Sequence, residues 1–162
     1  FAGTWCVAEG ERGALAAIRP AFESIGARVT EIEARHKTLY HAASVMVCNY
    51  LTALMEAGLR CYEQAGLPRA TASEMMAPLV RETLDNVLKM GTVKALTGPI
   101  ARGDTAVVAR QLAALGEFDA RLLDVYRALG VQALELARPN LERGGASADA
   151  LAALQKLLDK GA

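Results

Sequence analysis

The residues best suited to chemistry lie in the segment 37–52, which is poor in charge and helical in its spacing. Polar side chains recur in it mostly at steps of three or four residues: Thr38, His41, Ser44, Cys48, Asn49 and Thr52. At about 100° per residue these positions share one broad face of a helix. Since a wholly apolar core needs no such face, this segment is the first place to look for a functional site.

The segment before it alternates between strand-like and helix-like patterns. The first ten residues contain a short β-type run that ends on a turn, 14–25 has helical apolar spacing, and 28–33 alternates as a strand after Gly26. Two strands joined by one helix are expected to be parallel neighbours, and an isolated parallel pair is not a stable sheet. We therefore expect more of the sheet upstream of Phe1 or in a partner.

From Ala34 onward the pattern predicts helices almost throughout. A long element is expected from Arg35 to Ala65, then a helix capped by Thr71 or Ser73 that reaches Met90. Beyond Gly91 we expect a Gly- and Pro-containing loop over 92–104 and three helices: from Asp104 or Thr105 to Leu115, 118–138, and one capped by Ser147 that reaches Leu158. The prediction is a domain over residues 1–34 and a mainly α-helical domain over 35–162.

Composition excludes several classes of protein. The chain has 162 residues, of which 52% are hydrophobic, and 18 basic residues balance 18 acidic ones. A net charge of zero provides no broad basic surface, so neither nucleic acid nor an anionic membrane is expected as a partner. The apolar run 39–55 is interrupted by polar residues and is expected to be too short to span a bilayer.

The three cysteines, Cys6, Cys48 and Cys61, are widely spaced and lack metal-type spacing to either histidine. We expect them to be reduced, buried thiols of a cytoplasmic protein, and we expect no metal site. Met75, Met76 and Cys48 are expected to fill the core rather than to bind a metal or act in redox chemistry.

Three segments together resemble a known family. They are YHAASVMVCNYL (40–51), LTGPIARGD (96–104) and YRALG (126–130). They resemble the C-terminal part of Rossmann-type NADP oxidoreductases of the 6-phosphogluconate-dehydrogenase-like superfamily. The resemblance implies an N-terminal dinucleotide-binding domain, followed by a helical domain that contacts the substrate and forms the dimer interface. The chain has no Gly-x-Gly-x-x-Gly fingerprint, so the NADP-binding motif is expected upstream of Phe1 and no cofactor-binding residue is assigned here.

The resemblance also implies catalytic residues. Hydroxyacid dehydrogenases of the superfamily place a Lys and an Asn one helical turn apart, where they bind and protonate a carbonyl oxygen. Lys37 occupies the Lys position, His41 stands where the Asn is expected, and Asn49 follows two turns later. A Lys or His cation can supply the proton that hydride addition to a carbonyl or imine demands, and an imidazole titrates closer to neutrality than an amine. Arg35 and His36 would make the entry locally positive and favour an anionic substrate or the phosphates of the cofactor.

Each of these residues also has a structural interpretation. His41 could be buried and hydrogen-bonded to a carbonyl, to Tyr40 or to Tyr50, and Lys37 could be a solvated residue of the first turn. Ser44 and Asn49 are expected to be buried, so each needs a partner, which a neighbouring helix, a dimer seam or a ligand could provide.

The loop around Thr97 and Arg102 likewise has two interpretations. Arg102 could bind a substrate carboxylate, or it could simply pair with Asp104 at a helix entry. We take Lys37, His41 and Asn49 as candidate catalytic residues, and Ser44, Thr97 and Arg102 as candidate substrate-binding residues.

Two hypotheses follow. The first is the substrate-binding and dimerisation part of an NAD(P)-dependent oxidoreductase that acts on a small carbonyl or imine, inactive without its nucleotide domain. The second is a non-catalytic helical module for dimerisation or small-molecule binding. A homodimer is expected in either case, because the apolar helix over 40–61 exposes more surface than one small bundle can cover. An enzyme would leave Lys37 and His41 open at the carboxyl edge of the sheet, whereas a binding module would cover them.

Overall fold

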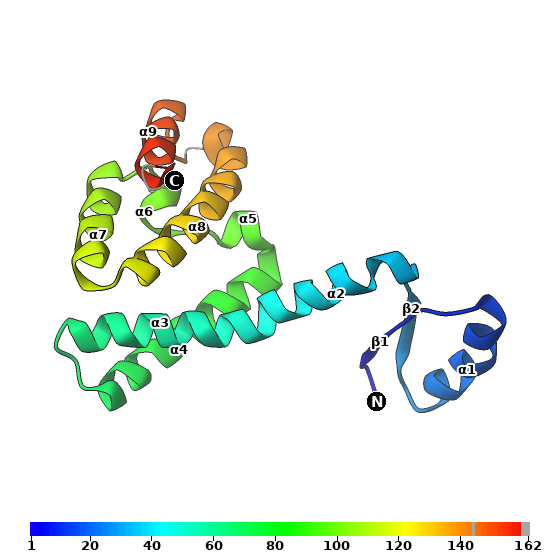
Figure 1. Cartoon of the computed structure of the whole chain (residues 1–162). Helices are drawn as coiled ribbons and strands as arrows, with labels where there is room; N and C mark the ends of the chain where they lie inside the picture. The colour runs from blue at the N-terminus through cyan, green and yellow to red at the C-terminus, as the bar shows by residue number, and fades with distance from the viewer. Residues whose placement is uncertain (144, 160–162) are drawn as a thin grey trace. The chain divides into compact units, whose positions relative to one another are not determined.

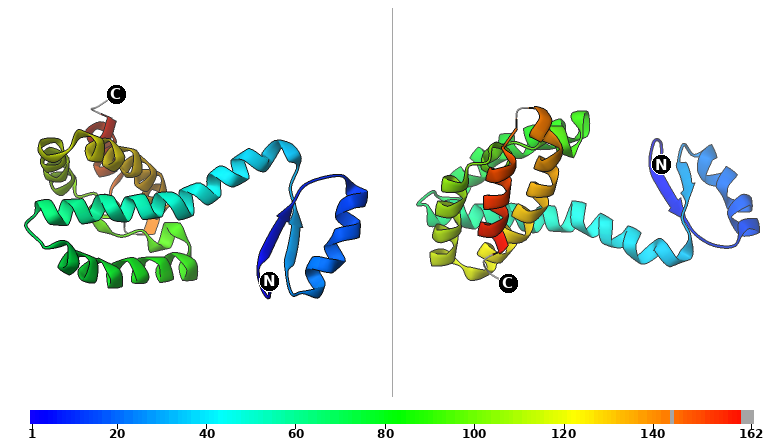
Figure 2. Two further views of the ribbon diagram at one scale, coloured as in Figure 1. Left: turned by 60° about the horizontal axis from the view of Figure 1, so that its bottom comes forward. Right: turned by 90° about the horizontal axis from the view of Figure 1, so that it is seen from above.

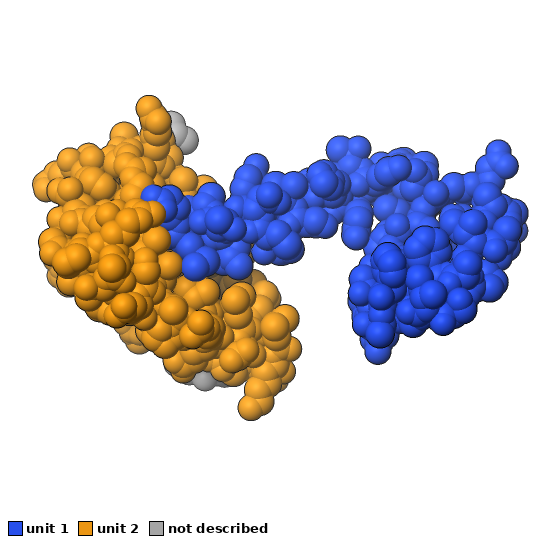
Figure 3. Space-filling view, turned by 90° about the horizontal axis from the view of Figure 1, so that it is seen from below, with its two compact units in different colours: residues 1–56 blue, residues 57–162 orange. Residues whose placement is uncertain are grey.

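The computed structural model describes residues 1–143 and 145–159, and these residues form two compact units, 1–56 and 57–162 (Figure 3). Each unit is described by itself below. The fold class agrees with the sequence prediction, since a short strand–helix–strand segment precedes a chain that is otherwise helical (Figure 1).

The first unit begins with two parallel strands joined by one helix. β1 (Trp5–Ala8) pairs with β2 (Arg28–Glu31) so that Trp5 lies opposite Arg28 and Ala8 opposite Glu31, and α1 (Arg12–Ser24) connects them. Gly26, with a φ of 87°, makes the turn from α1 into β2. The predicted order and the predicted parallel pairing are both confirmed.

A long helical stretch follows the strands. It consists of η1 (Ala34–His36), α2 (Lys37–Ser44), η2 (Val45–Asn49) and α3 (Tyr50–Gln64), and the boundary between the two units falls within α3. The segment η2 is a π-helix, in which the N–H of Tyr50 donates to the carbonyl of Val45, five residues earlier. The periodicity of the sequence predicted the long helix but not this wider turn.

The second unit contains α4 (Arg69–Met90), two short helices, α5 (Thr92–Ala95) and α6 (Gly98–Arg102), and then three longer helices with a 3₁₀ segment. These last elements are α7 (Thr105–Phe118), α8 (Ala120–Ala137), η3 (Arg138–Arg143) and α9 (Ala148–Asp159). α7, α8 and α9 pack against one another, and α6 packs against α7 and α8 (Figure 2). Leu134 of α8, Leu154 of α9 and Val108 of α7 are fully buried at the centre of this core.

Three of the predicted boundaries are wrong for identifiable reasons. α4 begins at Arg69 rather than after Thr71 or Ser73, because Pro68 adopts the extended N-cap conformation and its carbonyl accepts the first helical hydrogen bond, from Ala72. The expected loop over 92–104 contains α5 and α6 instead. The helix expected to begin at Phe118 begins at Ala120, since Asp119 serves as its N-cap.

The expected burial of the cysteines is also wrong. Cys48 is exposed, and Cys6 and Cys61 are half-buried. Met75 is 47% exposed, so it does not fill the core. Cys48 is exposed because little packs against the helix that contains it: from Ala34 to Gln64, the most apolar 18-residue window is only 6% buried.

Candidate functional site at the carboxyl ends of the strands

Lys37 lies beside the carboxyl end of β1. Its Nζ is 2.5 Å from Oε1 of Glu9, the residue that follows the last residue of the strand. The N–H of Ile32 donates to the carbonyl of Ala8 at 3.0 Å, so the two strands end together at this edge. In parallel α/β sheets, ligands bind outside the carboxyl ends of the strands, and this is therefore the edge at which a ligand is expected.

Lys37 and His41 are both exposed within their unit. The alternative in which His41 is buried and hydrogen-bonded to a neighbour is wrong. The two side chains are therefore not covered within this unit, and the contact with Glu9 places Lys37 at the carboxyl edge of the strands. Lys37 is the first residue of α2, directly after η1, so the position of η1 beyond β2 brings it to the edge.

The π-helix changes which residues share a face. A π-helical turn holds one residue more than an α-helical turn, so Asn49 lies one turn beyond Ser44, and Ser44 lies seven residues beyond Lys37. Positions i, i+4 and i+7 of an α-helix lie on one side. Lys37, His41, Ser44 and Asn49 thus form one polar face, which is narrower than the face predicted from uniform 100° steps.

Two residues of this face are less buried than the sequence suggested. Asn49 is exposed, and Ser44 is half-buried, with its hydroxyl 3.4 Å from the carbonyl of Tyr40 one turn earlier. The expected burial of both is wrong, because it assumed that the apolar residues around them belong to the core. Met46 and Val47 are 64% and 69% exposed.

The expected positive entry to the site is weaker than the sequence implies. Arg35 pairs with Glu33, with its Nε 2.8 Å from Oε2, and Lys37 pairs with Glu9. Two of the cations at the start of the helix therefore have carboxylate partners. Glu9 is a site residue that the sequence pattern did not indicate, although its position directly after a predicted strand placed it at the carboxyl edge of the sheet.

Thr97 and Arg102 lie in the second unit, at the two ends of α6. Thr97 is exposed at the N-cap position, where its side chain makes no capping hydrogen bond, and Arg102 is exposed in the last turn. Asp104 accepts a hydrogen bond from the N–H of Val107 at 3.0 Å and so caps α7. Asp104 makes no ion pair with Arg102 within residues 1–143 and 145–159, so that structural alternative is wrong.

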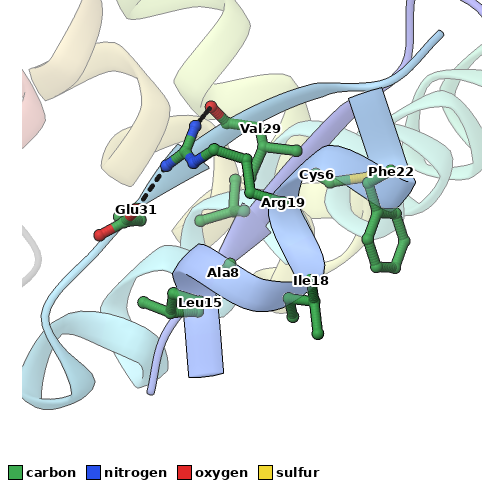
Figure 4. Close-up of a pocket in the computed structure, with 9 residues that line it drawn as sticks. Cys6, Ala8, Leu15, Ile18, Arg19, Phe22, Val29 and Glu31 are labelled. Carbon is green, nitrogen blue, oxygen red and sulfur yellow. Dashed lines mark hydrogen bonds and ion pairs between the residues drawn. The ribbon is translucent and has the colours of Figure 1, made fainter. Parts of the chain in front are cut away.

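A hollow of about 320 Å³ lies between α1 and the strands (Figure 4). Its lining is mainly apolar and includes Cys6, Leu15, Ile18, Phe22 and Val29. Arg19 of α1 lies at one side, donates to the carbonyl of Val29 at 3.0 Å and pairs with Glu31. The hydrogen bond to Glu31 raises the pKa of the Arg19 guanidinium above its usual value. The carboxylate of Glu31 also lines this hollow but is held in its ion pair with Arg19, so the hollow is best described as the space between a helix and its sheet.

The turn from β1 into α1 does not fit the phosphates of a dinucleotide. In Rossmann domains a glycine-rich turn and a helix N-terminus hold the pyrophosphate. Here Glu9 precedes that turn and Glu11 is the N-cap of α1, and both carboxylates would repel phosphate. Within the described ranges, no group of three or more His, Cys, Asp or Glu side chains could hold a metal ion.

The helix Ala34–Gln64 is long and apolar enough to cross a membrane, by length and composition alone. The expectation that this segment is too short is wrong, since the helix has 31 residues and extends beyond the apolar run at both ends. Six of its exposed side chains are large and apolar: Leu39, Tyr40, Met46, Val47, Tyr50 and Leu54.

The fold gives the class of this protein, which is a helical domain preceded by the remnant of a Rossmann-type sheet. Basic and polar residues lie at the carboxyl ends of the strands. Residues 4–133 match the family described as "Domain of unknown function (DUF2520)", and the chain belongs to that family. No protein of curated function matches it.

Two crystal structures are similar to the chain. Protein TM1727 from Thermotoga maritima is 27% identical with a TM-score of 0.74, and the match covers 86% of this chain and 54% of that protein. The "putative NADP oxidoreductase BF3122" from Bacteroides fragilis is 26% identical with a TM-score of 0.59, and the match covers 73% of this chain and 44% of that protein. The chain thus spans about half the length of these two proteins.

Proposed function

We propose that this chain is the substrate-binding and dimerisation part of a longer NADP-dependent oxidoreductase, cytoplasmic and homodimeric, that reduces a small carbonyl or imine. The observation that supports it best is the place of Lys37, beside Glu9 at the carboxyl end of β1, with His41 one turn later and both exposed. The similarity to the protein described as "putative NADP oxidoreductase BF3122" supports the choice of chemistry.

In this proposal the chain supplies protons and orientation. The hydride would come from NADPH held by a nucleotide-binding domain outside these residues, since the turn after β1 does not fit phosphate. The ammonium of Lys37 would donate a hydrogen bond to the substrate oxygen and stabilise the negative charge that forms on it. His41 would deliver the proton, and the amide of Asn49 would orient the substrate.

The substrate-binding roles of Ser44, Thr97 and Arg102 are a separate part of the proposal. Ser44 lies on the same helical face as Lys37 and Asn49. Thr97 and Arg102 are exposed at the ends of α6 and have no side-chain partner in residues 1–143 or 145–159, so both are available to a ligand. A guanidinium such as that of Arg102 would bind a carboxylate of the substrate in a bidentate manner.

The exposed apolar side of the helix Ala34–Gln64 supports a homodimer. Leaving so many large apolar side chains in water is unfavourable, and a second copy of the same helix would cover them. A purely structural dimerisation module, our second hypothesis, would use the same surface but would have no need for Lys37 and His41.

The test is a fluorescence titration of the full-length protein with NADPH, followed by NADPH oxidation with a panel of small keto acids and imines. We expect Lys37→Ala and His41→Ala each to lower kcat by about 10²-fold or more, because the first removes the group that stabilises the charge on the substrate oxygen and the second removes the proton donor. Lys89→Ala makes the same chemical change as Lys37→Ala at the end of α4 and should leave turnover near the wild-type rate.

Each outcome decides between the two hypotheses. NADPH binding with turnover that depends on Lys37 and His41 would establish the reductase. Failure of the full-length protein to bind NADPH would contradict it and favour the structural module. The chain over residues 1–162 alone should bind no dinucleotide tightly. Saturable NADPH binding by it would contradict the proposal that a domain outside these residues holds the cofactor.

A further inference from the structure

We propose that Glu9 is the positioning residue for Lys37, holding its ammonium at the carboxyl edge of the strands so that two of its N–H groups face the substrate. The inference rests on the proposed function, because it concerns the geometry of the same site. It adds a residue that neither the sequence analysis nor the similarity to other proteins indicated.

The ion pair joins a fixed group to a mobile one. Glu9 follows β1 directly, next to a hydrogen bond between the strands, and its side chain is 26% exposed. The side chain of Lys37 is 66% exposed and has a flexible four-carbon stem. Glu9 is therefore the anchor, and Lys37 is the group whose position it determines.

Glu9 is the only acceptor for Lys37 within residues 1–143 and 145–159. The Nζ–Oε1 distance of 2.5 Å joins residues that are 28 positions apart in the chain. Without this contact the ammonium would sample many rotamers, whereas a catalytic group has to be held close to one geometry.

The electrostatic field at the start of the helix is a second reason why Lys37 needs a carboxylate partner. Lys37 lies in the first turns of the helix that begins at Ala34, where the exposed N–H groups give the helix terminus a partial positive charge. A lysine there is disfavoured by that charge. The carboxylate of Glu9 offsets the repulsion and keeps the ammonium near the sheet edge.

The number of N–H donors that the contact with Glu9 leaves unused suits catalysis. An ammonium has three N–H donors, and the bond to Glu9 uses one of them. The two that remain can donate to a carbonyl oxygen. Glu9 itself need not touch the substrate, so it acts through Lys37.

The test combines kinetics with a measurement that needs no substrate. The variants are Glu9→Gln, Lys37→Ala and the double variant of the full-length protein. Glu33→Gln is the matched control, since it removes an equal charge from a carboxylate that pairs with Arg35 instead. We expect Glu9→Gln to lower kcat about 10- to 100-fold with little change in KM, and Glu33→Gln to leave both nearly unchanged.

The double variant separates positioning from a general structural effect. If Glu9 acts through Lys37, Glu9→Gln should lower kcat no further once Lys37 is alanine. A full loss in the Lys37→Ala background would overturn the proposal, and so would normal turnover by Glu9→Gln alone. If Lys37→Ala itself leaves turnover unchanged, the proposed function fails instead.

The second measurement is NMR of the protein after reductive ¹³C-methylation of its lysines, which keeps their charge. We expect the methyl signals of Lys37 to be shifted and restricted in motion in the wild type and in Glu33→Gln, and to resemble those of a free lysine in Glu9→Gln. Identical Lys37 signals in the wild type and Glu9→Gln would overturn the proposal, whether or not a substrate has been found.

Discussion

The carboxylate of Asp119 lies 2.6 Å from a guanidinium nitrogen of Arg60 and accepts a hydrogen bond from the N–H of Arg121 at 2.8 Å. The guanidinium of Arg60 also lies over the ring of Phe118, 5.8 Å from its centroid. One carboxylate therefore begins α8 and also binds the last turns of α3.

These contacts predict a pH dependence of stability. The hydrogen bond from Arg60, followed by that from the N–H of Arg121, lowers the pKa of Asp119 below its usual 3.8. A carboxylate with a lowered folded-state pKa stabilises the fold above its unfolded-state pKa, and this contribution is lost as pH falls through the folded-state value.

Asp119→Asn should therefore have a lower Tm than the wild type at neutral pH, and the difference should disappear in strong acid. Thermal unfolding followed by circular dichroism across the acid range measures both. A Tm difference that does not change with pH would mean that the charge of Asp119 is unimportant.

Gly103 is predicted to tolerate no side chain. It ends α6 with a φ of 73°, and a Cβ there would lie 2.8 Å from the Cβ of Ala150 and 2.9 Å from that of Ala146. Gly103→Ala should cost about 1–3 kcal/mol of unfolding free energy, because neither methyl group can rotate away.

Gly66→Ala is the matched control for this change. Gly66 has a similar φ of 93°, but nothing lies within 4 Å of its would-be Cβ. It should show only the cost of the backbone conformation, about 1 kcal/mol. Equal losses in the two variants, measured by urea unfolding, would contradict the predicted close packing of α6 against α9.

Leu154 is predicted to be a main contributor to the core of the second unit. It is fully buried between α9 and its neighbours, so Leu154→Ala should lower the unfolding free energy by about 2–5 kcal/mol. Leu88 of α4 is 84% exposed, and Leu88→Ala should change the unfolding free energy by less than about 0.5 kcal/mol. A comparable loss at Leu88 would show that its surface is covered in solution.

The proposed dimer can be tested by placing a charge on the apolar helix. Val47 is 69% exposed, and Val47→Glu should convert the dimer to a monomer, as measured by light scattering at micromolar concentration. Ala152→Glu adds the same charge to an exposed position of α9 and should leave the dimer intact. A monomeric wild type would contradict the proposal directly.

Local signals in the sequence were sufficient for much of the fold. The alternation around β1 and β2, with Gly26 between helix and strand, predicted a parallel pair that the structure contains. Gly91 ends α4 as predicted, and Ser147 caps α9 with a 3.2 Å hydrogen bond from the N–H of Ala150. These features depend on single residues with strong backbone preferences, which a sequence displays directly.

The features that the sequence did not predict depend on tertiary packing or on the number of residues in a helical turn. Nothing local distinguishes the π-helical turn of η2 from a continued α-helix, and apolar residues such as Met46 and Val47 indicated burial where the structure has an exposed surface. The contact between Glu9 and Lys37 joins two elements, so it became visible only when the strands and the helix were placed together.

The π-helical turn accommodates one residue more than a regular α-helix would place between Ser44 and Asn49. If one residue were deleted between positions 45 and 48, the remaining sequence would form an unbroken α-helix, and Asn49 would still lie one turn beyond Ser44 on the side of Lys37. If the segment kept its length and became a regular α-helix, Asn49 would instead be turned by about 100° away from Lys37 around the helix axis. Relatives of this chain should therefore either keep the π-helical turn or lack both the turn and one residue.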